Sequence, residues 1–179
     1  MSSDTDENAD RDLYLAIGRL VTETARFEDE LQTTLFSLFL DDHLLLLLAG
    51  QSWEWYVESI KTVVMQCIRI AWQEEREELL AILNASQELR ESRNWVVHGV
   101  WERTCWWGEG CIASPTAIED PDRLYHFARG RVRKDFTERQ FTVTDIETLA
   151  NRVRDLGRNL QGIRKKINRR FREYVPNEE

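Results

Sequence analysis

Residues 75–99, EREELLAILNASQELRESRNWVVHG, carry apolar side chains at steps of three and four residues. This spacing places the apolar groups along one face of an α-helix. Gly99 follows the periodic run directly, and glycine is typical of the position just past a helix C-terminus because it takes a positive φ without steric cost. The sequence therefore predicts a long amphipathic helix whose last turn contains His98.

The same periodicity occurs on both sides of this helix. Residues 12–40 repeat leucine, isoleucine and phenylalanine at helical steps, and a further apolar stripe follows Ser52, which can cap a helix. Residues 44–48 are apolar and predict a short buried helical turn. Thr144 and Glu147 have the spacing of a capping box and predict the start of the last helix. The fold class is therefore mainly α: an antiparallel helical bundle of about four to five helices.

The segment before the last helix, residues 101–143, loses this periodicity and contains turn signals. Leu124–Phe127 and residues 132–136 resemble short strands around Gly130, and residues 140–143 can add a third. We therefore predict a small β-hairpin insertion before the last helix. Its aromatic residues and arginines can stack nucleic-acid bases or pack the small sheet, and both interpretations stay open.

The chain of 179 residues is 42% hydrophobic, which suffices for one packed core. We predict a single helical domain over residues 11–175. Residues 1–10 are acidic and polar without an apolar segment, so they predict a disordered lead rather than a signal peptide. The longest apolar run, residues 44–49, is far shorter than the roughly 20 residues that span a bilayer. We therefore expect a cytoplasmic protein without a membrane partner.

Two polar residues near the end of the helix predicted over residues 75–99 carry groups that suit phosphate chemistry. Arg93 offers a permanent cation and a planar fork of donors that fits phosphate oxygens, and His98 can take and give protons near neutral pH. On a helix, Asn94 and His98 share a face, whereas Arg93 points about 140° away from His98. The two groups can therefore meet only if the long arginine side chain bends towards the histidine. The other interpretation is a capped helix end in which both residues have structural partners.

The pattern Arg93-Asn94-x-x-x-His98, at the end of a long helix, resembles the R-x(4–6)-H signature of the HEPN superfamily (higher eukaryotes and prokaryotes nucleotide-binding). The helical layout of residues 11–103 is similar to that of the family. This resemblance implies a small all-α bundle, usually a homodimer. It also implies a metal-independent endoribonuclease that leaves a 2',3'-cyclic phosphate and a 5'-hydroxyl.

Many members of this family resemble toxins or antiviral defence components. The resemblance therefore implies RNA as the substrate and an antitoxin or defence-system protein as a further partner. Arg93 and His98 carry over as catalytic residues, with Asn94 supporting them. In the family the paired motifs meet at the dimer interface, and Trp95 and Val96 are our candidates for that contact.

An alternative function stays open. Some members of the family are inactive, and the chain can instead be a non-catalytic dimeric helical module that binds RNA, a nucleotide or a protein partner. Arg93 and His98 then form only a structural pair. The sequence contains no Gly-rich phosphate loop, nucleophile elbow or paired-carboxylate motif, so the common hydrolase and nucleotide-binding mechanisms lack their residues.

Two further sets of charged residues are candidates for the site. Glu28 on the first helix can orient Arg93, or it can belong to a solvated face. Residues 123–172 carry fifteen Lys and Arg against five Asp and Glu, although the whole chain has a net charge of −8. This basic end can attract RNA phosphates, or it can pair with the acidic half of the chain. The residues predicted to bind RNA are Arg164, Lys165, Arg169 and Arg172.

We predict neither a metal nor a cofactor. Cys105 and Cys111 flank a turn, but their spacing is not that of a zinc-binding cysteine pair, and no fourth ligand is evident. The chemistry of the motif is therefore expected to come from side chains alone.

Overall fold

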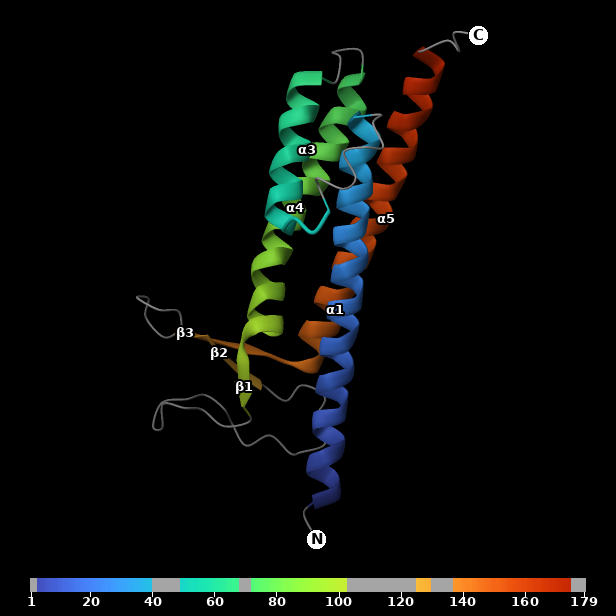
Figure 1. The fold of residues 1–179 in the computed structure, drawn as a ribbon. Coiled ribbons are helices and arrows are strands. Elements are labelled where there is room, and N and C mark those ends of the chain that lie inside the picture. Colours follow the sequence, from blue (N-terminus) through green and yellow to red (C-terminus); the bar gives the residue numbers. More distant parts are fainter. Residues whose placement is uncertain (1–2, 40–48, 68–71, 103–124, 130–136, 175–179) are drawn as a thin grey trace. The chain divides into compact units, whose positions relative to one another are not determined.

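The computed structural model describes residues 3–39, 49–67, 72–102, 125–129 and 137–174. Within these ranges the protein is mainly α, with four helices and a small antiparallel sheet before the last helix (Figure 1), which confirms the predicted fold class. The helices are α1 (Ser3–Phe39), α3 (Trp53–Cys67), α4 (Gln73–His98) and α5 (Val143–Tyr174). None of these described helices carries the long uncharged stretch that a bilayer crossing needs.

The chain divides into two compact units, and each is described by itself. Unit 1 consists of residues 1–23 and 89–152, and unit 2 consists of residues 24–88 and 153–179. Helices α1, α4 and α5 contribute residues to both units. The single domain predicted over residues 11–175 stays a prediction.

Helix α1 begins earlier than the sequence indicated. It starts at Ser3, so residues 3–10 are helical where a disordered lead was predicted. Apolar periodicity begins only at Leu13, and a periodic signal cannot reveal polar first turns.

The core of unit 2 follows directly from the helical periodicity. Leu31 and Leu35 of α1 are fully buried, as are Ile60 of α3 and Leu83 of α4. Each such side chain contributes about 1.5–3 kcal/mol relative to leaving it exposed. Helix α5 adds buried residues at helical steps, namely Val153, Leu160, Ile163 and Ile167. The apolar stripes read from the sequence therefore identify this core correctly.

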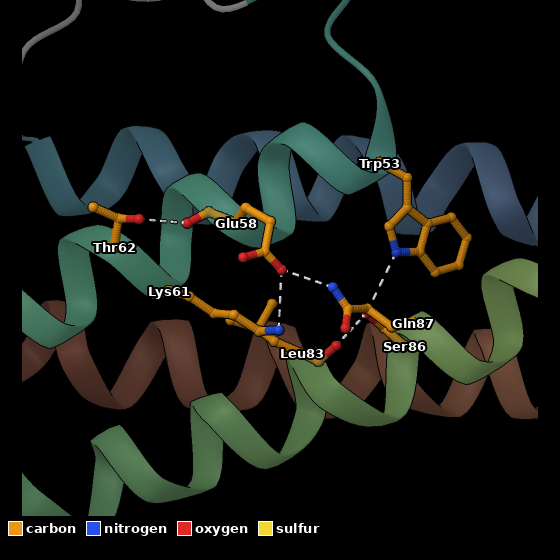
Figure 2. A network of polar contacts seen from close by, with 7 residues as sticks. All are labelled: Trp53, Glu58, Lys61, Thr62, Leu83, Ser86 and Gln87. Carbon is orange, nitrogen blue, oxygen red and sulfur yellow. Dashed lines mark hydrogen bonds and ion pairs between the residues drawn. The ribbon is translucent and has the colours of Figure 1, made fainter.

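Polar side chains also connect α3 with α4 inside unit 2, as Figure 2 shows. The indole Nε1 of Trp53 donates to Ser86 Oγ at 3.3 Å, and Ser86 Oγ donates to the Leu83 carbonyl at 2.7 Å. Gln87 Nε2 donates to Glu58 Oε1 at 2.7 Å. Because Ser86 is fully buried, its hydroxyl depends on these protein partners in place of water. These bonds fix how the two helices face each other.

Unit 1 contains three short strands, β1 (Val100–Glu102), β2 (Tyr125–Arg129) and β3 (Thr137–Phe141). They pair antiparallel in the order β1-β2-β3. Trp101 lies opposite Phe127, and Phe127 lies opposite Arg139. Opposed residues of neighbouring strands point to the same face of a sheet. Phe127 is fully buried on the face that it shares with Trp101 and Arg139, and His126 is fully buried on the opposite face.

The sheet differs in detail from the predicted hairpin. Strand β2 confirms a strand near Leu124–Phe127, and β3 overlaps the third strand expected at residues 140–143. The strand predicted at residues 132–136 lies outside the described residues. The chain enters β1 directly after Gly99, so this segment supplies one more strand than a hairpin has.

Helix α5 begins at Val143, before the cap predicted at Thr144. Thr142 Oγ1 accepts a hydrogen bond from Asp145 N at 2.9 Å, and Asp145 Oδ2 accepts one from Thr142 N at 2.8 Å. This reciprocal pair is a capping box with aspartate in the acidic position. Thr142 and Asp145 have the same spacing as Thr144 and Glu147, so the sequence offered two equivalent caps. The structure uses the first, and the predicted cap was wrong.

Candidate functional site

The motif lies at the junction between a helix and a strand in unit 1. His98 is the last residue of α4, and Gly99 N donates to the Trp95 carbonyl at 2.9 Å, which closes the last turn. Strand β1 then begins at Val100. Trp95 and Val96 are buried, so apolar packing anchors this end of the helix. The polar residues of the motif are therefore presented on a fixed support.

The arginine and the histidine of the motif meet. Arg93 Nη1 donates to Asn94 Oδ1 at 2.9 Å and lies 3.2 Å from His98 Nε2. The arginine side chain thus bends across the helix surface towards the histidine, as the helical geometry required. A guanidinium has donors only, so a hydrogen bond here requires Nε2 to accept, as it does in the neutral tautomer with the proton on Nδ1. This is the form of histidine that can take up a proton.

The three residues differ in exposure in a way that suits a macromolecular ligand. His98 is exposed, whereas Arg93 and Asn94 are half-buried. Exposure makes the imidazole accessible, and partial burial strengthens the field of the guanidinium because less water screens it. Together the residues can hold a phosphate group and move a proton beside it.

Trp95 and Val96 are not available as dimer contacts. Their side chains are 8% and 2% exposed, because the rest of the chain covers them. The prediction that they form a subunit interface was therefore wrong. Within the described part of unit 1, the large apolar side chains that are exposed are Tyr14, Leu15, Val21 and Val100.

The structure adds Arg139 to the surroundings of the motif helix. Arg139 Nη2 donates to Glu91 Oε1 at 2.6 Å, and its guanidinium carbon lies 5.2 Å from the centre of the Trp95 ring. Sequence reasoning missed this residue because β3 and α4 are far apart along the chain. The sequence showed only that Arg139 lies in a segment rich in aromatic residues. Such a segment can stack bases or pack a small sheet, and neither role specifies a contact with α4.

Glu28 belongs to unit 2, whereas Arg93 belongs to unit 1. The Glu28 side chain is half-buried on α1. Its predicted role in orienting Arg93 stays a prediction.

The basic end of α5 separates into two sets of residues. One set pairs with acids of unit 2: Arg164 Nε donates to Glu30 Oε1 at 2.6 Å with both side chains largely buried, and Lys166 and Arg170 pair with Glu78 and Glu75. The other set is an exposed row, and no ion pair is found for it among the described residues. It consists of Lys165, Arg169 and Arg172. The first set therefore pairs with acids of the chain itself, and phosphate binding by the exposed row stays a prediction.

No group of three or more His, Cys, Asp or Glu side chains within the described ranges is arranged to bind a metal ion. Cys105 and Cys111 lie outside these ranges. An open pocket of about 610 Å³ lies along α3 in unit 2. The pocket is lined by Ser52, Glu54, Trp55, Glu58, Ser59, Thr62 and Val63, none of which was predicted to belong to the site.

Comparison with known proteins adds no family to this description. No family model, no curated protein and no solved structure matches this chain. The arrangement of Arg93, Asn94 and His98 is thus the observation from which a function has to be argued.

Proposed function

We propose that this protein is a metal-independent endoribonuclease of the HEPN type. The observation that supports this proposal best is the 3.2 Å contact between Arg93 Nη1 and His98 Nε2 at an exposed helix end. The contact brings a phosphate-binding cation and a proton-transfer group together, as the R-x(4–6)-H pattern requires. The resemblance implies a cytoplasmic toxin or antiviral defence component that works with an antitoxin or defence-system partner.

The proposed reaction uses only side chains. The 2'-hydroxyl of RNA loses its proton to a base while its oxygen bonds to phosphorus, and the bond from phosphorus to the 5'-oxygen breaks as that oxygen takes up a proton. His98 serves at one of these proton transfers, and Arg93 turns to the phosphate and stabilises its developing charge. Asn94 holds the arginine. The products are a 2',3'-cyclic phosphate and a 5'-hydroxyl.

The exposed row on α5 is proposed to hold the RNA backbone. Lys165, Arg169 and Arg172 are separated by four and three residues, so they lie on one helix face. Such a row attracts phosphates and releases their counterions. Arg164 was predicted to belong to this set, but its guanidinium is already engaged by Glu30, and we leave it out of the proposal.

A homodimer is part of the proposal, because the family brings two motifs together. With Trp95 and Val96 inside the protomer, the contact has to use exposed apolar residues. Val100, which is 62% exposed and follows the motif directly, is our candidate.

The second candidate function is a non-catalytic module that binds RNA, a nucleotide or a protein partner. It is favoured by one observation: Arg93 Nη1 is already engaged by Asn94 and His98, as it would be at a purely structural helix end.

The experiment that tests the proposal is incubation of the purified protein with labelled single-stranded RNA in EDTA, followed by analysis of the product ends. We expect cleavage with cyclic phosphate ends, and none of a DNA strand of the same sequence, because DNA lacks the attacking hydroxyl. Cleavage that requires Mg²⁺ would contradict the mechanism, and RNA binding without cleavage would favour the second function. Light scattering of the same sample tests the dimer.

A further inference from the structure

The contact between Arg139 and Glu91 is more exposed than the ion pairs that join α5 to other helices. The Arg139 side chain is 44% exposed and that of Glu91 is 67% exposed. In the pairs that α5 forms with other helices, the acids are more shielded: Glu30 and Glu75 are 15% and 10% exposed, and Glu78 is 44% exposed. An exposed ion pair contributes little to stability, because water competes for both charges. Of these four acids, Glu91 is therefore the one that another anion can most easily replace.

The guanidinium of Arg139 is nevertheless held in place. It lies over the ring of Trp95, whose side chain is buried and therefore fixed. The opposition of Arg139 to Phe127 places it on the same face of the sheet as that buried ring, and from there it reaches Glu91 of α4. Loss of Glu91 as a partner would therefore leave the arginine on its aromatic support. A cation on a fixed support binds an anion with less loss of side-chain freedom.

Arg139 also lies on the same side of α4 as the histidine of the motif. Glu91, Trp95 and His98 are separated by four and three residues, which places them on one helix face. Along the helix axis, His98 lies about 4.5 Å beyond Trp95 and about 10 Å beyond Glu91, at roughly 1.5 Å per residue. Stacked nucleotides of one strand rise about 3.4 Å each, so this span corresponds to a few nucleotides.

We propose that Arg139 binds an RNA phosphate that neighbours the scissile one, and that Glu91 occupies its guanidinium in the free protein until that phosphate displaces it. Carboxylate and phosphate both accept the paired N–H groups of a guanidinium, so one can take the place of the other. This inference rests on the proposed function, since it assumes that His98 acts on RNA. Arg139 is then a substrate-binding residue, and Glu91 is an internal competitor.

The proposal predicts opposite signs for two single substitutions. Arg139→Gln removes the phosphate ligand and should weaken binding of a fluorescent single-stranded RNA about tenfold at low salt. Glu91→Gln removes the competitor and should tighten binding several-fold. Binding is measured in the His98→Ala background, so that no RNA is cleaved. Arg158→Gln and Asp155→Asn, which alter an exposed ion pair within α5, are the matched controls for the change in net charge.

A cleavage assay sharpens the test. A dinucleotide has a single phosphodiester, so Arg139 finds no neighbouring phosphate, and the effect of Arg139→Gln on kcat/KM should be much larger for a decanucleotide than for a dinucleotide. Equal effects on both substrates, or weaker binding in both the Arg139 and the Glu91 variant, would overturn the inference. Wild-type cleavage would in that case leave the proposed function standing. A wild-type protein that neither binds nor cleaves RNA would remove both.

Discussion

The polar contacts of unit 2 and those of the motif differ in how far they reach along the chain. Glu30 and Arg164 lie 134 positions apart and join α1 to α5. Trp53 and Ser86 lie 33 positions apart and join α3 to α4. In contrast, Arg93 and His98 are five positions apart at the end of one helix.

This difference distinguishes polar contacts that stabilise the fold from polar contacts that we expect the fold not to require. Contacts between distant segments are lost when the chain unfolds, so they contribute to the free energy of unfolding. The contact between Arg93 and His98 joins residues of the same helix. Trp95 and Val96, which are apolar and buried, anchor the end of α4. We therefore predict that the polar groups of the motif can change without loss of the fold, as is expected of residues kept for chemistry.

The largest expected effect belongs to the motif. Arg93→Ala should lower the rate of RNA cleavage about 10²-fold or more, because the charge on the phosphoryl oxygens loses its stabilising cation. Its Tm should stay within a few degrees of wild type. Arg93→Lys should restore only part of the rate, since lysine lacks the planar fork. A large fall in Tm for Arg93→Ala would show that the motif stabilises the fold, as the polar contacts of unit 2 do.

The next largest effect belongs to the ion pair between Glu30 and Arg164. Glu30→Gln should lower the free energy of unfolding by about 2 kcal/mol, because it leaves a largely buried guanidinium without its counter-charge. Urea unfolding measures this change. The control is Glu78→Gln, whose partner Lys166 is half exposed, and for which we expect about 0.5 kcal/mol or less. Equal losses in the two variants would show that burial does not decide the strength of these pairs.

A smaller effect is expected for Trp53→Phe, which keeps an aromatic ring but removes the indole N–H. Loss of the hydrogen bond to Ser86, together with the smaller ring, should cost about 1 kcal/mol in urea unfolding. Trp55→Phe is the control, because the Trp55 side chain is exposed on the same helix. A larger loss for Trp55→Phe than for Trp53→Phe would contradict the role assigned to this hydrogen bond.

The smallest change in stability is expected for the exposed row on α5. Replacing Lys165, Arg169 and Arg172 together with glutamine should alter the free energy of unfolding by about 0.5 kcal/mol or less. The same variant should bind RNA more weakly, with a flatter slope of log affinity against log salt. Normal RNA binding combined with altered stability would mean that this row serves the protein's own structure.

The sequence allowed the helices and their cores to be predicted, because apolar periodicity reports directly on which face is buried. The sequence did not identify the cap of α5. Thr142 and Thr144 are each followed three residues later by an acidic residue, so both fit a capping box. It also failed at the start of α1, whose polar first turns carry no periodic signal.

Within the site, only contacts between residues close in sequence could be predicted. Arg93 and His98 are close enough in sequence for helical geometry to set the condition under which they meet. Arg139 of β3 and Arg164 of α5 pair with residues 48 and 134 positions away along the chain. No rule of local spacing predicts such pairs. The burial of Trp95 and Val96 was missed for a related reason. Their position beside the motif suggested a surface role, although other parts of the chain cover both side chains.

The central claim is that the motif performs chemistry and does not support the fold, and His98→Ala tests it most directly. Wild type and variant are compared for cleavage of labelled single-stranded RNA in EDTA and for Tm in the same buffer. We predict that the variant loses cleavage by about 10²-fold or more while its Tm stays within a few degrees of wild type. Unchanged cleavage, or a loss of cleavage that parallels a large fall in Tm, would contradict the claim.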